Sequence, residues 1–489
     1  MQQNSESHAQ YIRAVRARRL RVIITVAVTV ALCAAYIVAD ATGLVHGVIT
    51  TDPVSVRTLG APQETIPAAD FPGRADTGKT IDTERAQTLV DALTSADGVG
   101  SDVSVAIAQT DGTIVASHEL TAPREPASTM KTLTSLAAAS QLNMGSTLAT
   151  NVYVTNEDPQ SASIVLQGNG DMLLSSGQSD PNHVNGRAGL ATLANQTAAA
   201  LGKRGITSVK LAYDDTLFGT QRYPERVGEN NGDNLYYTGV SSMAIDGGRQ
   251  WNGNQPADPD LFEAYPPLSQ NTAQDTANMF AAKLRDAGIT VTGGVSGIDN
   301  AGHDKLAKLE PVAQVRSATL SSIMRFMLRH SDNTLAEEFG RLLAIHMHED
   351  NSPQGATTAV RRELETLHIP TGDLQMADCS GLSPGSHLTV ETLVSVQERN
   401  LTPGNAVAAA EGLSIPGLVG TAEYRLASAN AAGLMRVKTG SLSQVTALTG
   451  NVSRQNGGVA AFSIVINNPK DVTKAKAAMN TFMAGLTEL

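Results

Sequence analysis

The chain has 489 residues, of which 41% are hydrophobic and 17% are charged. These fractions are typical of a globular protein with several domains, and they exclude a collagenous or disordered chain. The net charge is −11, although five arginines and only one acid occupy the first 21 residues. The rest of the chain is therefore strongly acidic, which argues against a nucleic-acid partner, because phosphate binding requires a basic face.

The first predicted element is an apolar segment that follows these arginines. Residues 22–39 are 18 consecutive residues without a charge, the lower limit for a transmembrane helix. The preceding arginines predict a cytoplasmic tail over residues 1–21 and an extracytoplasmic body, and hence a single-pass protein of the cell membrane. The alternative is a protein secreted after cleavage near Ala41, since Ala39-Asp40-Ala41 has the small side chains of a signal-peptide cleavage site. The length of the run favours the anchor.

Residues 40–78 carry four prolines and are predicted to be an extracytoplasmic linker. Regular structure is expected to start near Asp82, a helix-cap candidate, and a hairpin is expected around Asp111-Gly112. Short β-type runs alternate with two helical patterns up to about residue 300. Longer helices, the first over 316–329, then precede a terminal set of strands and a last helix.

This order predicts a multi-domain α+β protein. A sheet assembled from both ends of the chain, with a helical lobe beside it, would form the main domain from residues 79–146 and 305–489. Residues 147–304 would form an inserted β-rich domain.

The first motif with chemical meaning is Ser128-Thr129-Met130-Lys131, at the start of a predicted helix. Residues three apart on a helix share one face, about 5–6 Å from each other. A buried lysine there can lose its proton at neutral pH and accept the proton of the serine hydroxyl. Taken alone the motif is weak, because a serine at a helix start is more often an ordinary cap.

Two further motifs follow along the chain. Ser331-Asp332-Asn333 lies at a predicted helix junction, where a hydroxyl could relay a proton and an amide could bind a peptide carbonyl. The run 438–441 (KTGS) ends a predicted strand. A cation and a hydroxyl there suit a terminal carboxylate, and a glycine lets another backbone approach. A helix cap and a strand end are the alternatives without a catalytic role.

Together and in this order, the three motifs are characteristic of serine enzymes that react with penicillin. Ser128 and Ser331 are 203 positions apart, more than a compact β-lactamase needs, which indicates an inserted domain. Over roughly residues 80–489 the chain resembles the D-alanyl-D-alanine carboxypeptidase/endopeptidase family of class C low-molecular-mass penicillin-binding proteins. Other strings similar to this family are 168–171 (GNGD), 214–218 (DDTLF), 331–337 (SDNTLAE) and 378–383 (DCSGLS).

The resemblance implies a penicillin-binding/serine β-lactamase-like transpeptidase fold, with helices flanking an antiparallel sheet. It also implies serine-type D-Ala-D-Ala carboxypeptidase activity on peptidoglycan stem peptides, with D,D-endopeptidase activity as an additional expectation. Ser128 would attack the carbonyl between the last two D-Ala residues, Lys131 would be the general base, and Ser331 would relay the proton to the leaving amine. β-Lactam antibiotics would be covalent inhibitors.

The same resemblance implies which residues bind the substrate. Asn333 would hold the acyl chain, while Lys438 and Thr439, together with Gly440, would bind the terminal carboxylate.

The oxyanion hole would consist of the backbone N–H groups of Ser128 and Ser441. Asp214 would lie near the free amine of the diamino acid in the stem peptide, although the adjacent Asp215 and a plain turn aspartate are alternatives.

The chain differs from the family pattern at two places, and two other functions are alternatives. Only residues 250–271 stand where the family has a long β-rich stretch, and Cys379 replaces a glycine. A serine β-lactamase is one alternative, but it would need a deacylating glutamate in an E-x-x-L-N string, which is absent between Asn333 and Lys438. A non-catalytic cell-wall-binding protein is the other.

No cofactor and no metal are expected. Cys33 and Cys379 are the two cysteines, and they are not expected to pair because the first lies in the apolar run. No zinc-type Cys/His set occurs. Residues 346–350 (HMHED) contain metal-type side chains but are interpreted as a solvated helix end.

Overall fold

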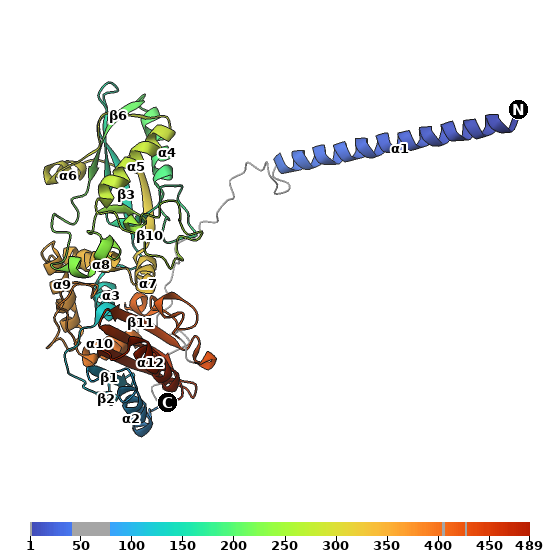
Figure 1. Ribbon diagram of the computed structural model, residues 1–489. Coiled ribbons are helices and arrows are strands. Elements are labelled where there is room, and N and C mark those ends of the chain that lie inside the picture. Colours follow the sequence, from blue (N-terminus) through green and yellow to red (C-terminus); the bar gives the residue numbers. More distant parts are fainter. Residues whose placement is uncertain (1, 42–78, 403–405, 426–427) are drawn as a thin grey trace. The chain divides into compact units, whose positions relative to one another are not determined.

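The computed structural model describes residues 2–41, 79–402, 406–425 and 428–489 of the chain (Figure 1). The chain divides between residues 67 and 68 into two units, which are described separately. The linker predicted over 40–78 lies almost entirely outside the described residues.

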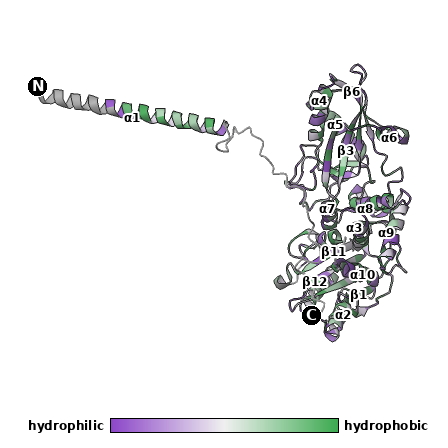
Figure 2. Cartoon of the chain, turned by 180° about the vertical axis from the view of Figure 1, so that it is seen from behind, coloured by the Kyte–Doolittle hydropathy of each residue, from purple (hydrophilic) through white to green (hydrophobic). Residues whose placement is uncertain are grey.

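The N-terminal unit contains one long helix, α1 (Gln2–Ala41). Residues Arg18–Asp40 of this helix are long and apolar enough to cross a membrane, with a mean hydropathy of 2.6. Figure 2 shows this apolar part in green next to the hydrophilic arginines. The helix is consistent with a single-pass anchor or with a signal sequence.

The second unit contains a five-stranded antiparallel sheet in the order β11-β12-β13-β1-β2. Its strands come from both ends of the described body, as the sequence predicted, and the expected hairpin at Asp111-Gly112 joins β1 to β2. The helices α2 and α12 pack into one apolar core of this sheet and α10 into the other. Asp82 caps α2 as expected. The bounds are β1 Val103–Ala108, β2 Ile114–His118, β11 Met435–Leu442, β12 Val445–Ser453, β13 Val459–Asn467, α2 Thr83–Thr94, α10 Val390–Leu401 and α12 Val472–Leu486.

A lobe of helices lies beside this sheet. The helix α3 (Met130–Gln141) is at its centre, because ten consecutive residues from its first turn onward are buried whatever face they occupy. It contacts α8, α9 and α10. The surrounding helices are α7 Leu320–His330, α8 Asn333–His346, α9 Pro353–Thr366 and α11 Val407–Glu411.

A second, mixed sheet has the order β10-β3-β4-β6-β8, with β9 also paired to β6. The pair β4–β6 is parallel, and α4 and α5 share the apolar core of this sheet. A small parallel pair, β5–β7, lies outside it. The bounds are β3 Thr147–Asn156, β4 Ser163–Gly168, β5 Asp171–Leu174, β6 Ser208–Asp214, β7 Met243–Ile245, β8 Thr290–Val291, β9 Ser296–Gly297, β10 Ala313–Thr319, α4 Leu190–Gly202, α5 Thr272–Asp286 and α6 Asn300–Leu306.

The start of the helix predicted over 316–329 is wrong. Residues up to 319 belong to β10, which pairs with β3, and α7 begins at Leu320 after Thr319 caps it. The strand β10 thus joins the second sheet, although the predicted boundary at residue 305 assigns it to the main domain.

Candidate active site

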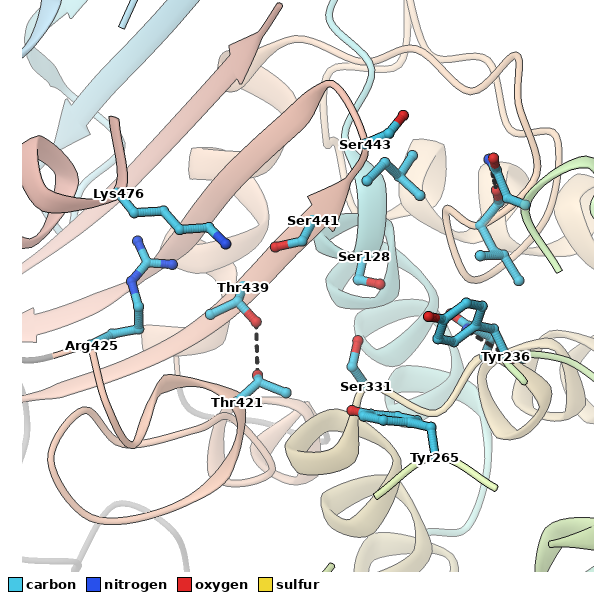
Figure 3. A pocket seen from close by; sticks show the side chains of 14 residues that line it. Ser128, Tyr236, Tyr265, Ser331, Thr421, Arg425, Thr439, Ser441, Ser443 and Lys476 are labelled. Atoms are coloured by element: carbon cyan, nitrogen blue, oxygen red, sulfur yellow. Dashed lines mark hydrogen bonds between the residues drawn. The ribbon is translucent and has the colours of Figure 1, made fainter. Parts of the chain in front are cut away.

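The three motifs meet at one pocket of about 590 Å³ (Figure 3). The predicted residues that line it are Ser128, Ser331, Asn333, Thr439 and Ser441. The two motif lysines lie behind this wall and are fully buried. Segments far apart in the sequence therefore converge as the motifs predict.

Ser128 lies in a short 3₁₀ turn, η2 (Ala127–Thr129), that leads into α3. Ala127 has a φ of 48°, a backbone conformation that residues other than glycine rarely adopt. Its carbonyl oxygen faces Gly381, where an added Cβ would clash with it. Ser128 Oγ accepts a hydrogen bond from Lys131 Nζ at 3.0 Å, so the hydroxyl faces the lysine rather than serving as an ordinary helix cap.

The amine of Lys131 has two further partners. Nζ donates to Asn333 Oδ1 at 2.7 Å and to the carbonyl oxygen of Ser380 at 2.9 Å. The orientation of the Asn333 amide is fixed because its Nδ2 donates to the carbonyl oxygen of Tyr236 at 2.9 Å. Both of these partners of Lys131 are therefore acceptors only.

These contacts determine where the lone pair of the neutral amine points. A neutral amine has two N–H groups, which the oxygens of Asn333 and Ser380 accept, and its lone pair is left for the hydroxyl of Ser128. Burial lowers the pKa of Lys131 to about 7, against the opposing charges of Asp378 and Asp332. At neutral pH a large fraction of the molecules thus holds a base next to the nucleophile.

Ser331 lies at the junction between α7 and α8, with a left-handed φ of 57°. Lys438 Nζ donates to Ser331 Oγ at 3.0 Å. Burial, followed by the charge of Lys131, holds the pKa of Lys438 well below its usual value. In Figure 3 the hydroxyl of Ser331 points toward Ser128, which suits a proton relay.

The strand β11 supplies the hydroxyls of Thr439 and Ser441 to the pocket. Thr439 Oγ1 donates to Thr421 Oγ1 at 2.7 Å. Gly440 lies between Thr439 and Ser441 on this strand. A Cβ added to it would lie 2.7 Å from the carbonyl oxygen of Pro126. A glycine is thus required for β11 to reach the turn that carries the nucleophile, whereas its contact with a substrate backbone stays a prediction.

The 378–383 segment forms a tight loop around one carboxylate. Asp378 Oδ1 accepts the backbone N–H groups of Ser380 and Gly381 at 2.8 and 2.6 Å, and Oδ2 accepts that of Ser383 at 2.7 Å. This loop holds the Ser380 carbonyl against Lys131. The sequence resemblance included the loop but gave it no role in the site.

An arginine clamp holds the start of α8 from the side of the inserted region. Arg249 Nη2 donates to Asp332 Oδ2 at 2.6 Å, and the two side chains are only 7% and 11% exposed. The guanidinium lies 4.5 Å from the ring centroid of Phe262, which stacks on His330 at 4.3 Å. Phe262 belongs to the shortened stretch 250–271, so this stretch supports the junction that carries Ser331. No motif marks the clamp in the sequence.

Asp214 and Asp215 are not among the residues that line the pocket. Asp214 is 2% exposed, and its Oδ2 lies 3.0 Å from Gln167 Nε2 and 2.7 Å from His303 Nδ1. Burial raises the pKa of Asp214, but these hydrogen bonds outweigh it and leave the pKa lowered. Asp215 accepts from Arg222 at 2.8 Å. Both carboxylates have partners within the inserted region, and a contact of Asp214 with the amine of the stem peptide stays a prediction.

Four of the lining residues that sequence reasoning missed have large aromatic or cationic side chains. Tyr236 and Tyr265 have ring centroids 6.1 Å apart at one side of the pocket, and Arg425 and Lys476 lie at the other. They come from unrelated segments with no shared spacing, so the sequence holds no signal that groups them.

One group of metal-type side chains occurs among the described residues, formed by His183, Asp258 and Asp260. Asp260 accepts the backbone N–H groups of Val184 and Asn185 at 2.9 and 2.8 Å, so its carboxylate already fastens a loop. The histidines of the 346–350 segment are exposed at the end of α8.

Comparison with known proteins agrees with this geometry. A model of the D-Ala-D-Ala carboxypeptidase 3 (S13) family matches residues 86–261 and 252–488. Carboxypeptidase DacB of Mycolicibacterium smegmatis is 31% identical over 355 residues, which cover 71% of this chain and 72% of that protein. The D-alanyl-D-alanine carboxypeptidase of an Actinomadura species is 29% identical over 240 residues, which cover 47% of this chain and 42% of that protein. The crystal structure of penicillin-binding protein 4 from Haemophilus influenzae matches with a TM-score of 0.65 at 20% identity, over 84% of this chain and 100% of that chain.

The fold and the site define a serine hydrolase of the penicillin-binding type. The chain belongs to the D-Ala-D-Ala carboxypeptidase 3 (S13) family. The expected family, fold class and serine carboxypeptidase activity are thereby confirmed.

The thiol of Cys379 packs against a glycine of the facing helix α8. Gly340 lies within α8, and a Cβ added there would clash with Cys379 Sγ. Burial raises the pKa of the Cys379 thiol well above its usual value, so the side chain packs as an uncharged group.

We expect Gly340→Ala to lower the melting temperature of the full chain in detergent, because overpacking a core costs about 1–3 kcal/mol. Adding Cys379→Gly should restore it, since the clashing sulfur is removed. Gly202→Ala is the matched control, because a Cβ added to this last residue of α4 would have no other atom within 4 Å. Differential scanning fluorimetry measures all four proteins. Equal melting temperatures for Gly340→Ala and the unchanged protein would contradict this packing.

Proposed function

We propose that Ser128 is the nucleophile of this carboxypeptidase and that its substrate is a peptidoglycan stem peptide ending in D-Ala-D-Ala. The observation that carries the proposal is the arrangement of Lys131, whose Nζ lies 3.0 Å from Ser128 Oγ and also contacts the oxygens of Asn333 and Ser380. In the neutral amine these two oxygens would accept the N–H groups and leave the lone pair for Ser128. The names of the relatives support the substrate. A crystal structure shows penicillin-binding protein 4 of H. influenzae complexed with a β-lactam.

In this mechanism Ser128 Oγ attacks the carbonyl between the two D-Ala residues as Lys131 Nζ takes its proton. The backbone N–H groups of Ser128 and Ser441 stabilise the oxyanion. When the C–N bond breaks, Ser331 passes a proton to the leaving amine, and an acyl-enzyme on Ser128 remains. Water then hydrolyses the ester and frees the enzyme. A β-lactam would follow the first step and stay attached, because its leaving group remains part of the adduct.

The terminal carboxylate would lie against the hydroxyls of Thr439 and Ser441, with the buried amine of Lys438 behind them. Asn333, which lines the pocket and contacts Lys131, would bind the acyl chain. Asp214, whose carboxylate also faces Gln167 and His303, would lie near the free amine of the diamino acid, with Asp215 as the alternative.

We further propose that residues 79–146 and 305–489 form the peptidase domain and that 147–304 are an insertion. Most of the inserted region packs around one apolar core, to which Ala313 and Val315 of β10 also contribute, and this shared core supports the division in the main. Limited proteolysis of the full chain should cut in the loops at 142–146 and 307–312, which flank β3 and α6, and leave fragments of about these sizes.

The experiment that tests the nucleophile is intact-mass analysis of the full chain with benzylpenicillin. We expect a lasting adduct of one penicillin, which Ser128→Ala should abolish. Ser443→Ala is the matched control, because this serine lines the same pocket without an assigned role. Labelling of Ser128→Ala would disprove the assignment. Rapid turnover of penicillin without an adduct would favour a β-lactamase, and no reaction at all would favour a non-catalytic protein.

The rate of acylation should depend on pH through Lys131. The neutral amine is the active form, and its pKa lies at about 7. The rate constant should therefore fall about tenfold per pH unit below 7 and level off above it. Stopped-flow acylation by a chromogenic β-lactam from pH 5 to 10 measures this profile. A rate that keeps rising up to pH 10 would mean that the lysine keeps its ordinary pKa.

We propose that α1 is retained as a membrane anchor, with residues 1–21 in the cytoplasm and the catalytic body outside. The apolar part of α1 and the arginines before it support this orientation. The protein should then stay in the membrane fraction after a carbonate wash and retain the residues that precede Thr42. A mature protein that starts at Thr42 would show cleavage after Ala41 instead.

A further inference from the structure

One side of the pocket carries two cations that the proposed mechanism does not use. These are Arg425 and, on α12, Lys476. None of the residues that line the pocket is acidic. The positive charges at this opening are therefore not offset by acids of the pocket, although the protein as a whole is acidic. Such an arrangement favours the binding of an anion.

Arg425 is fixed in place without a counter-charge. Its Nε donates to Asn480 Oδ1 at 2.8 Å, and its Nη2 lies 3.8 Å from Met479 Sδ. Burial lowers the pKa of Arg425, and no charged group opposes that effect. A partly buried charge normally has an ionic partner, because desolvation is otherwise costly. No carboxylate in the described part of the chain lies within ion-pair distance of Arg425, so a ligand is the missing partner.

Lys476 has no ion pair either among the described residues. The contrast with Lys474, two positions away on the same helix, is informative, because Lys474 pairs with Asp97 at 2.6 Å on the surface. In Figure 3 the ends of Arg425 and Lys476 approach one another, although like charges repel. A bound anion would remove this repulsion.

The position of the two cations indicates which part of a substrate they meet. In the view of Figure 3, Thr439 and Ser441 lie between Ser128 and the two cations. The carboxylate next to the scissile bond belongs to the leaving group, and these hydroxyls would hold it. Arg425 and Lys476 therefore lie further along the leaving group, beyond its first carboxylate.

We propose that Arg425 and Lys476 bind a second carboxylate of the leaving group. This inference rests on the proposed function and names its substrate class. A single D-Ala has only one carboxylate, whereas a leaving group that is itself a stem peptide carries more. The site thus favours cross-linked stem peptides, in which cleavage after D-Ala releases a second peptide strand, and the activity it serves is that of a D,D-endopeptidase.

The test compares three substrates on the full-length protein. They are a stem peptide ending in D-Ala-D-Ala, a cross-linked dimer, and the same dimer with the distal carboxylates of its leaving strand amidated. We expect the unmodified dimer to have the higher kcat/KM of the two dimers. Arg425→Gln with Lys476→Gln should lower kcat/KM for the unmodified dimer about tenfold more than for the amidated dimer or the single peptide, since a charge-assisted contact is lost. Arg425→Lys should restore part of the difference.

Lys474→Gln is the matched control, because it removes the same charge from the same helix outside the pocket and should leave all three rates unchanged. Penicillin acylation of each variant reports whether the catalytic centre is intact. Equal losses on all three substrates would show that the cations bind the first carboxylate, and no loss would show that they bind none. Either result overturns the inference. If the protein without substitutions cleaves none of the three substrates, the proposed function itself is overturned.

Discussion

The active site depends on the burial of one amine. Lys131 lies inside α3, where no water solvates an ammonium group, so burial favours the neutral form and each N–H group needs an acceptor. Those acceptors come from α8 and from the loop around Asp378, while the hydroxyl comes from η2. An unpaired buried polar group costs about 1–3 kcal/mol. The same three hydrogen bonds therefore hold three distant segments together and prepare the nucleophile.

The inserted region matters for chemistry although none of the three catalytic motifs lies in it. The arginine clamp joins Arg249 to Asp332, and both side chains are nearly buried. Asp332 lies between Ser331 and Asn333 in the second motif. Loss of Arg249 would leave the Asp332 carboxylate buried without its partner, which is more costly than the pair is stabilising. The shortened stretch 250–271 adds Phe262 and Tyr265, one behind the junction and one in the pocket wall. The insertion thus sets both the position of Ser331 and the shape of the binding site.

The sequence was sufficient where local signals agree with the fold. The hairpin at Asp111-Gly112 and the cap at Asp82 follow from their own side chains, and the three motifs meet because each has a fixed place on its element. Contacts between distant segments were not predictable. Residues 316–319 form a strand only because β3 is available to pair with them. In the same way, a motif resemblance names Asp214 but cannot tell that Gln167 and His303 face its carboxylate.

The distribution of charge explains how an acidic protein can take an anionic substrate. The two acids whose charges act on the catalytic lysine do not line the pocket, since Asp378 accepts backbone N–H groups and Asp332 pairs with Arg249. Their charges still oppose the loss of the proton from Lys131, which keeps its pKa near neutrality rather than far below it. The pocket itself offers hydroxyls and cations without a carboxylate. In a chain with a net charge of −11, the two cations at this opening would attract an anionic peptide toward Ser128.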